Sequence, residues 1–170
     1  MIRYTAPALV LAALLLNGTA QAQVCPKNVK LTTPDSRYEL QNEGSEVLDR
    51  KTKLVWQRCS LGQVWDGSTC SGTASHYTWQ QAMEAAKVAT GGWTLPDSHA
   101  LRTLVERGCN NPAINVTIFP NTPNAGFWSS SSAKNRSTHA WNMYFSYGNG
   151  YFDKKNDHYA VRLVRPQQEK

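Results

Sequence analysis

Apolar residues in the middle of the chain recur with the period of a helix. Four of them are spaced at i, i+3, i+4 and i+7: Trp79, Ala82, Met83 and Ala86. This spacing places them on one face of an α-helix. Thr78 directly before them is a suitable N-cap, and the pair Gly91-Gly92 is a stop signal. The pattern predicts an amphipathic helix that begins at Trp79 and ends before Gly91.

A second helical pattern follows at once. Pro96 opens it, and either Asp97 or Ser98 can cap its first turn. Its apolar stripe is supplied by Leu101, Leu104 and Val105. We expect this helix to end at Gly108.

Toward both ends of the chain the apolar period is two, which is typical of strands. Residues 46–49 and 53–56 are rich in β-branched and aromatic side chains and predict a hairpin around residues 50–52. Alternation then places Leu54 and Trp56 on one face of the second strand. Further strands are predicted at 38–40, 126–130, 140–147, 150–153 and 159–164.

Within the late strands, Asn149-Gly150 is a strong signal for a hairpin turn. The overall order is strands, then two helices, then strands, which favours an α+β domain. Residues 159–164 need a partner strand and the chain ends soon after them. We therefore expect the N-terminal and C-terminal strands to pair.

The first 22 residues have the pattern of a cleaved secretory signal peptide. Arg3 supplies a positive start, residues 8–16 are apolar but too short to span a bilayer comfortably, and Ala20-Gln21-Ala22 is a small-x-small cleavage site. An uncleaved membrane anchor is the alternative. We expect a periplasmic or secreted bacterial protein with no membrane span after cleavage, an N-terminal tail over residues 23–36 and a single domain over residues 37–166.

The cysteines of the chain favour disulfides over a metal site. There are four, an even number, and all follow residue 22, which in an exported chain is typical of two disulfides. Of the three possible pairings we favour Cys59–Cys70, which closes a polar, glycine-rich loop, together with Cys25–Cys109, which ties the tail to the end of the second helix. A four-cysteine zinc site is the alternative, but no Cys-x-x-Cys pair occurs.

Charge and motifs exclude several functional classes. The formal net charge is +6, and residues 1–22 hold Arg3 and no acidic residue, so the mature chain carries +5. This mild positive charge favours anionic partners, but nucleic acid is not expected for an exported protein. The four histidines form no His-x-x-x-His pair, and the serines of residues 129–132 lack a Gly-x-Ser-x-Gly elbow. We therefore expect no enzyme, no catalytic residue, no cofactor and no metal.

Several short motifs follow one another in the order of a known family. They are Leu54 to Gln57, Trp79 with Ala82, Gly92-Trp93-Thr94-Leu95-Pro96, Leu101 with Leu104, Phe119-Pro120, Trp128 to Ser131 and Val161 to Arg165. From about residue 38 to 165 the chain resembles the Lcl C-terminal domain family, named after the end domain of the Legionella collagen-like adhesin. The resemblance implies a C-type-lectin-like fold, with two helices beside a small antiparallel sheet and long loops that carry ligand sites. It also implies an exported binding module, which in some members is an adhesin for sulfated polysaccharides.

The chain departs from this family and fold in two ways. It has no collagen-like Gly-x-y repeat, and it lacks the Glu-Pro-Asn triplet with which sugar-binding C-type lectins coordinate calcium. Trp141-Asn142 resembles the lectins' Trp-Asn-Asp motif, but Met143 stands in place of the acid, and the nearby acids are only Asp153 and Asp157. Because calcium takes six to eight oxygen ligands, several of them carboxylates, we do not expect calcium-dependent sugar binding.

The late loops hold the candidate ligand-binding residues. Residues 133–139 include Lys134, Arg136 and His139, and the following connection holds Lys154 and Lys155. If the flanking strands are neighbours, these side chains gather at one end of a sheet, where Arg and Lys suit sulfate or carboxylate groups. The alternative is that they are ordinary solvated turn residues.

Aromatic side chains are the second class of candidates. Trp65 in the glycine-rich loop and Tyr151 beside the turn signal are candidates for stacking on a sugar. The other tryptophans are expected in the core: Trp56, Trp79, Trp93, Trp128 and Trp141. For Arg162 and Arg165 we weigh an ion pair, with Asp49 or Asp97, against a role in ligand binding.

Two functions therefore compete. The first is an exported lectin-like binding or adhesion module that recognises an anionic glycan or cell-surface polymer without calcium. The second is an accessory structural subunit of a pilus, secretion or envelope complex, with a protein as its partner.

Overall fold

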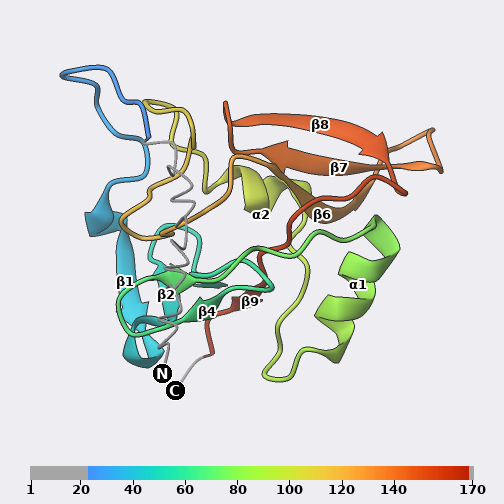
Figure 1. Ribbon diagram of the computed structural model, residues 1–170, viewed down its shortest axis with the longest axis horizontal. Coiled ribbons are helices and arrows are strands. Elements are labelled where there is room, and N and C mark those ends of the chain that lie inside the picture. The colour runs from blue at the N-terminus through green and yellow to red at the C-terminus, as the bar shows by residue number, and fades with distance from the viewer. Residues whose placement is uncertain (1–22, 169–170) are drawn as a thin grey trace, which may run out of the picture.

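The computed structural model describes residues 23–168, so the predicted signal peptide lies outside the described residues. The fold is an α+β arrangement, as predicted (Figure 1). The described strands form three antiparallel sheets, of order β1-β2-β3-β9, β4-β5 and β6-β7-β8. The strands are β1 (Tyr38–Gln41), β2 (Glu46–Asp49), β3 (Leu54–Gln57), β4 (Val64–Trp65), β5 (Cys70–Ser71), β6 (Gly126–Ser132), β7 (His139–Tyr144), β8 (Asn149–Lys154) and β9 (Val164–Pro166). The helices are α1 (Trp79–Val88) and α2 (Ser98–Arg102), with short 3-10 turns at Asp35–Arg37 and Asn42–Gly44. Between residues 23 and 168 there is no helix long and apolar enough to cross a membrane.

The predicted hairpin of β2 and β3 is present, with Glu46 opposite Gln57 and Asp49 opposite Leu54. The carboxylate of Asp49 organises its turn by accepting hydrogen bonds from the Lys51 backbone N–H at 3.0 Å and the Thr52 hydroxyl at 2.7 Å. It also accepts from Nε of Arg37 at 2.7 Å. Asp49 is fully buried, and these three donors offset the cost of burying its charge.

Helix α1 begins where the sequence predicts. Thr78 and Gln81 form a capping box, because the Thr78 hydroxyl accepts from the Gln81 N–H while the Gln81 side chain accepts from the Thr78 N–H. The buried face of the helix is made by Ala82 and Ala86. These small side chains let α1 lie close to β6, where they pack in a core cluster with Trp128 and Leu163.

Helix α2 is shorter than predicted, because it ends at Arg102 and not at Gly108. The Asp97 side chain caps its start by accepting from the Ala100 N–H at 2.7 Å. At its end the Thr103 hydroxyl donates back to the Ala100 carbonyl, a local bond that competes with continued helix. The chain then turns, and Val105 bridges Ile114 as an isolated β pair. The apolar stripe is still buried, but beyond Arg102 it belongs to a turn and a bridge.

The turn between β7 and β8 is not at Asn149-Gly150, so that prediction is wrong. Those two residues begin β8, opposite Tyr144 and Met143. The connection is formed by residues 145–148, and Phe145 within it is fully buried. A Cβ on Gly148 would lie 2.5 Å from the Val105 side chain. The connection is therefore packed into the core, and this tertiary packing outweighs the local turn preference.

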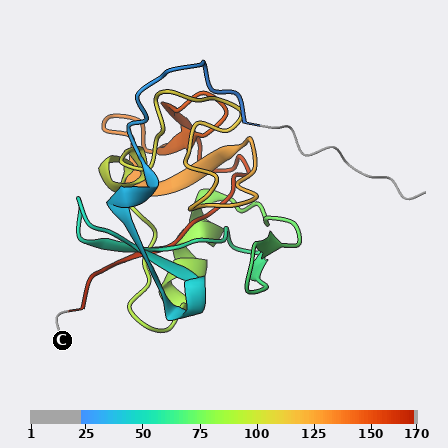
Figure 2. The same ribbon diagram turned by 90° about the vertical axis from the view of Figure 1, so that its left-hand side faces the viewer.

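The C-terminal segment joins the larger sheets. The sequence predicts one strand over residues 159–164, but Tyr159 pairs with Tyr77, Ala160 bridges β6 at Phe127, and β9 begins only at Val164. Strand β9 then pairs with β3, so the expected pairing of early and late strands is present. Figure 2 shows the two larger sheets stacked, with this segment running between them. Residues 159–166 therefore connect the β6-β7-β8 sheet to the β1-β2-β3-β9 sheet.

The core has two clusters, one on either side of this segment. The larger contains Trp56, Phe127 and Phe145, and the smaller contains Trp128 with the buried face of α1. Trp79 and Trp93 are partly buried against the smaller cluster. Trp141 departs from the prediction: it is only partly buried and packs edge-on against Phe152 at 5.1 Å, on the surface of the β6-β7-β8 sheet.

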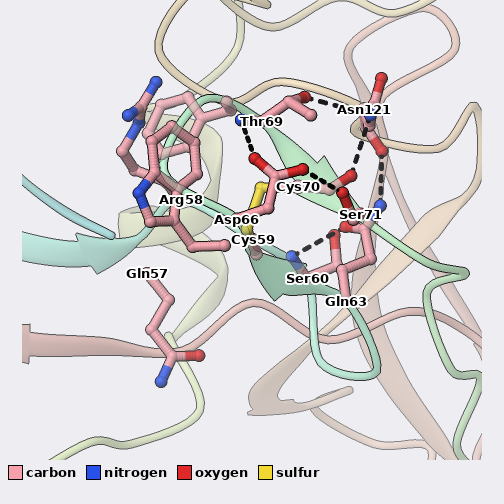
Figure 3. Close-up of a disulfide and its surroundings, with 12 residues drawn as sticks. Gln57, Arg58, Cys59, Ser60, Gln63, Asp66, Thr69, Cys70, Ser71 and Asn121 are labelled. Atoms are coloured by element: carbon pink, nitrogen blue, oxygen red, sulfur yellow. Dashed lines mark hydrogen bonds between the residues drawn. A yellow bond between two sulfur atoms is a disulfide. The ribbon is translucent and has the colours of Figure 1, made fainter. Parts of the chain in front are cut away.

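Both favoured disulfides, Cys25–Cys109 and Cys59–Cys70, are present. The second closes the β4-β5 loop (Figure 3). Inside that loop the Asp66 carboxylate accepts from the Ser71 hydroxyl and from the N–H groups of Thr69 and Ser68. The Ser71 bond, followed by the backbone bonds, holds the pKa of Asp66 well below its ordinary value. The loop is therefore ordered by its own hydrogen bonds as well as by the disulfide.

Two arginines, Arg58 and Arg162, are buried without a carboxylate, and we call them the buried arginine pair. Arg162 donates to the carbonyls of Gln57 and Arg58 and to the hydroxyls of Thr122 and Ser60. Among residues 23–168 neither arginine forms an ion pair. The expected ion pair of Arg162 with Asp49 or Asp97 is therefore wrong. Burial, and next the charge of Arg58, lower the pKa of Arg162 to about 9, which leaves it charged at neutral pH.

Arg165 does form an ion pair, but its acid is neither of those predicted. Its guanidinium lies 2.6 Å from the Glu46 carboxylate and 4.8 Å from the centre of the Trp93 ring. Asp49 is engaged by Arg37 instead, and Asp97 caps α2. Arg165 thus fixes β9 to the start of β2, and both arginines of this segment have structural partners.

Candidate functional site

The five basic and imidazole side chains proposed from the late loops lie at one end of the β6-β7-β8 sheet: Lys134, Arg136, His139, Lys154 and Lys155. We call this group the basic end. His139 and Lys154 are directly opposite each other in the β7-β8 register. The Lys155 N–H donates to the Thr138 carbonyl at 2.8 Å, which holds the two connections together. Figure 1 shows this end of the sheet at the right, above the start of α1.

The loop before β7 is held in a compact turn by its backbone. The Arg136 N–H donates to the Ala133 carbonyl, the His139 N–H to the Arg136 carbonyl, and the Ala133 N–H to the His139 carbonyl. Asn135 has a φ of 67°, a left-handed conformation that Asn accepts more readily than most residues. The turn keeps the side chains of Lys134 and Arg136 exposed to solvent.

Aromatic rings support two of the five basic-end side chains. The Arg136 guanidinium lies 4.8 Å from the centre of the Phe152 ring, and that ring packs edge-on against Trp141. The Lys155 ammonium lies 4.2 Å from the Trp79 ring of α1. Such cation–π contacts orient a cation without neutralising it. Arg136 is therefore held over the sheet with its donors available, whereas Lys155 is partly occupied in packing.

The acids near the basic end are engaged in turns and networks. Asp157 accepts from the Lys154 backbone N–H, and Asp153 accepts from the Asn142 amide and the Tyr159 hydroxyl. Within the described part of the chain, no carboxylate forms an ion pair with a cation of the basic end. These cations can therefore receive an external anion, with Arg offering a fork and Lys a point charge.

The opposite face of the same sheet carries a tyrosine network. The Tyr159 hydroxyl accepts from Tyr144 at 2.8 Å and donates to Asp153 at 2.9 Å. Burial, followed by these two bonds, raises the pKa of Tyr159. Asn142, from the segment that resembles a lectin calcium motif, donates to the same Asp153 oxygen. Over residues 23–168 no group of three or more His, Cys, Asp or Glu side chains is placed to hold a metal ion.

Two of the proposed ligand residues do not join the basic end. Tyr151 lies opposite Asn142, on the face away from Phe152, and packs edge-on against Tyr144 at 5.5 Å. Trp65 lies in β4, where its indole N–H donates to the Glu43 carbonyl and its ring lies under the Arg58 guanidinium at 4.2 Å. The aromatic partners of the basic end are Phe152 and Trp141 instead.

Two grooves on the surface lie away from the basic end. One of about 600 Å³ runs between α2 and β9, and one of about 650 Å³ separates the disulfide loop from residues 112–124. Neither is lined by the five side chains of the basic end. The basic end is thus an open, charged end of a sheet, a shape that suits contact with a polymer chain more than enclosure of a small molecule.

A comparison with known protein families agrees with the motifs described above. A family model described as the Lcl C-terminal domain matches residues 45–165. No curated protein matches the chain.

Proposed function

Because the chain belongs to the Lcl C-terminal domain family, we propose that it is an exported binding module that holds an anionic glycan or cell-surface polymer through its basic end, without calcium. Family membership suggests an adhesin-associated domain. The two disulfides fit an extracellular or secreted domain. A C-type-lectin-like arrangement of the α+β fold and removal of residues 1–22 are parts of the same proposal.

The proposal depends on one observation above all. Three exposed cations lie at one end of a sheet with no carboxylate paired to them in the described part of the chain: Lys134 and Arg136 from the β6-β7 connection, and Lys154 from the end of β8. Sulfate and carboxylate groups repeat along acidic polysaccharides, so several cations can be engaged at once. Their individually modest, salt-screened attractions then add up.

The test is retention of the oxidised chain from residue 23 onward on immobilised heparin. The triple variant Lys134→Ser, Arg136→Ser and Lys154→Ser is expected to lose retention. The three side chains make no ion pairs within residues 23–168, so the melting temperature should fall only by what the lost Arg136–Phe152 contact contributes. Lys155 is left in place because it packs on Trp79. A chelator is expected to leave retention unchanged.

A matched control removes the same charge at the other end of the molecule. Lys27, Lys30 and Arg107 are exposed, and the Arg107 N–H is bonded to Thr32 of the N-terminal tail. Figure 1 shows that tail at the end of the molecule opposite the basic end. Their triple replacement by Ser should largely preserve retention. Equal losses in both triple variants would contradict the site, and loss with a chelator would contradict calcium independence.

The same oxidised protein can be used to test the competing function, that of an accessory subunit with a protein partner. A stoichiometric protein partner that co-purifies with the chain, together with silence on an array of acidic glycans, would favour the accessory role in a pilus, secretion or envelope complex.

A further inference from the structure

Strand β8 is an edge strand whose outer side is open. Its only strand neighbour among residues 23–168 is β7. Both backbone groups of Lys154 are bonded within the following turn, to Asp157, and both groups of His139 opposite it are bonded toward the preceding loop. This pair is therefore one of the non-hydrogen-bonded pairs of the β7-β8 ladder. Because such pairs alternate, Gly150 and Phe152 also direct their N–H and C=O groups away from β7.

In the described part of the chain, no donor or acceptor is bonded to these four outward groups of Gly150 and Phe152. Figure 1 shows β8 at the upper edge of the molecule, with no segment beyond it. An open edge of this kind is a template for another strand, and proteins commonly block it with proline, a bulge or charge. Here the Lys154–Asp157 turn closes one end, and the register with β7 is regular from Asn149 to Lys154.

Two positions on this edge, two residues apart, have complementary shapes: Gly150 leaves a gap and Phe152 presents a ring. A Cβ on Gly150 would lie 3.5 Å from the end of Met143 and 3.8 Å from the Trp141 ring. The Asn142 carbonyl oxygen would lie between them in distance, at 3.6 Å. These are ordinary contact distances, so Gly150 leaves a shallow gap on that face of the sheet, lined by two apolar side chains and one backbone carbonyl. Phe152 stands on the same face with 36 % of its surface exposed.

We propose that β8 pairs antiparallel with β8 of a second copy of this chain, about a two-fold axis at Tyr151. Gly150 then lies opposite the partner's Phe152, so each phenyl ring covers the gap at a glycine of the other chain. Gly150 and Phe152 exchange backbone hydrogen bonds with the partner's Phe152 and Gly150, and the two sheets become one of six strands. Lys154 falls opposite the partner's Gly148, which avoids a Lys–Lys contact.

The alternative register, shifted by two residues, places Phe152 opposite the partner's Phe152 and leaves Gly150 opposite the partner's Lys154. That arrangement leaves both gaps without an aromatic cover. The pairing centred on Tyr151 is the one that uses both features of the edge.

The first test compares the wild-type chain with Gly150→Val by sedimentation equilibrium over about 1 µM to 1 mM. The wild type is expected to approach twice the mass of one chain as concentration rises. Gly150→Val occupies the gap itself and is expected to stay at the mass of one chain. Valine favours strands and meets only ordinary contacts here, so its melting temperature should not fall. A wild type that stays at one chain, or a variant that dimerises equally, overturns the proposal.

The second test fixes the register by cross-linking. All four native cysteines are in disulfides, so Tyr151→Cys introduces the only thiol. In the proposed register that thiol lies opposite the same position of the second chain in a non-hydrogen-bonded pair, and mild oxidation should give a covalent dimer. Leu40→Cys, an exposed position on the edge strand β1, is the control and should stay monomeric. Equal cross-linking in the two variants would refute pairing through β8.

Discussion

Two groups of cations in this chain carry charge of the same sign in opposite surroundings. In the buried arginine pair most guanidinium nitrogens donate to protein oxygens. Arg58 donates to the carbonyls of Ile118, Gly44 and Thr117, and in Arg162 both terminal nitrogens have acceptors while Nε has none among the described residues. At the basic end, Lys134, Arg136 and Lys154 are exposed and make no ion pairs within the described residues. The positive charge of a side chain therefore says little about function until its acceptors are counted.

The difference has a physical cause. A guanidinium removed from water needs acceptors for most of its donors, because an unsatisfied buried charge is costly. Carbonyl groups of loops can do this, and in return the arginine fixes those loops in place. Arg162 ties the end of β3 to Thr122 and packs 4.8 Å from the Phe119 ring. The exposed cations keep their solvent and can exchange it for a ligand.

Arg162→Met is expected to have the largest effect on stability. It leaves the buried Arg58 carbonyl, the part-buried Gln57 carbonyl and the Thr122 hydroxyl without this donor, and each lost partner costs about 1–3 kcal/mol. We expect the free energy of unfolding to fall by about 4 kcal/mol, measured by urea denaturation of the oxidised protein. Lys134→Met, which also introduces methionine but at an exposed cation, should change the free energy of unfolding by less than about 0.5 kcal/mol. Similar costs for the two variants would remove the distinction between the groups.

A third arginine, Arg37, is half-buried and differs because it does have a carboxylate partner, Asp49. Burial by itself raises the pKa of Asp49, but the bonds from Arg37 and Thr52 outweigh it and hold the pKa below the ordinary value of 3.8. A lowered pKa in the folded state means that the contribution to stability is complete above that ordinary value and is lost as the pH falls through the folded value.

Asp49→Asn is therefore expected to lower the free energy of unfolding at neutral pH by about 3 kcal/mol and to flatten its fall in acid. The measurement is thermal unfolding from about pH 7 to pH 2. Arg162 binds carbonyls and hydroxyls, so Arg162→Met should lower the whole curve without changing its acid slope. An acid slope unaltered in Asp49→Asn would mean that other acids, such as Glu106, whose pKa is also lowered, dominate it.

Arg58→Met should be costly, but less than Arg162→Met. It removes the donor to three carbonyls, but Arg58 lies nearer the surface, where water can replace some of its bonds. We expect a loss of about 2 kcal/mol. The Trp65 ring also loses the guanidinium that covers it. A glycan titration monitored by indole fluorescence therefore tests whether Trp65 contacts a glycan. If Trp65 binds a glycan, Arg58→Met should uncover it and strengthen the response.

Most features predicted correctly from sequence are set by local interactions. The Thr78 N-cap of α1 and the β2-β3 hairpin follow from neighbouring residues. The gathering of the late-loop cations was predicted on the condition that the flanking strands are neighbours, and β7 and β8 are paired. Two correct predictions are long-range: the Cys25–Cys109 disulfide, favoured from the even number of cysteines, and the pairing of an early with a late strand, expected because the last strand needs a partner. The α2 terminus and the surroundings of Arg162 depend on segments far apart in the chain, such as Val105 with Ile114 and Arg162 with Thr122. No local pattern encodes those contacts.

The aromatic partners of the basic end were missed because of one error in register. A two-residue turn at Asn149-Gly150 would place Trp141 opposite His158. The actual connection, at residues 145–148, places Trp141 opposite Phe152. The turn lies earlier because Phe145 is buried and Gly148 packs against Val105. With the observed register, strand alternation places Phe152 and Lys154 on one face, together with Trp141 and His139.

Lys155 shares features of both groups of cations, and its replacement gives the smallest expected effect on stability. It belongs to the basic end, but its ammonium lies 4.2 Å from the Trp79 ring and its carbonyl accepts from the Trp79 N–H. Lys155→Ala should lower the free energy of unfolding by about 0.5–1 kcal/mol through the lost cation–π contact, whereas Lys154→Ala should not. On immobilised heparin the order should reverse, with Lys154→Ala losing more retention because its ammonium has no aromatic partner within residues 23–168. If both variants changed stability and retention equally, packing on Trp79 would not divert Lys155 from binding, and exposure alone would define the site.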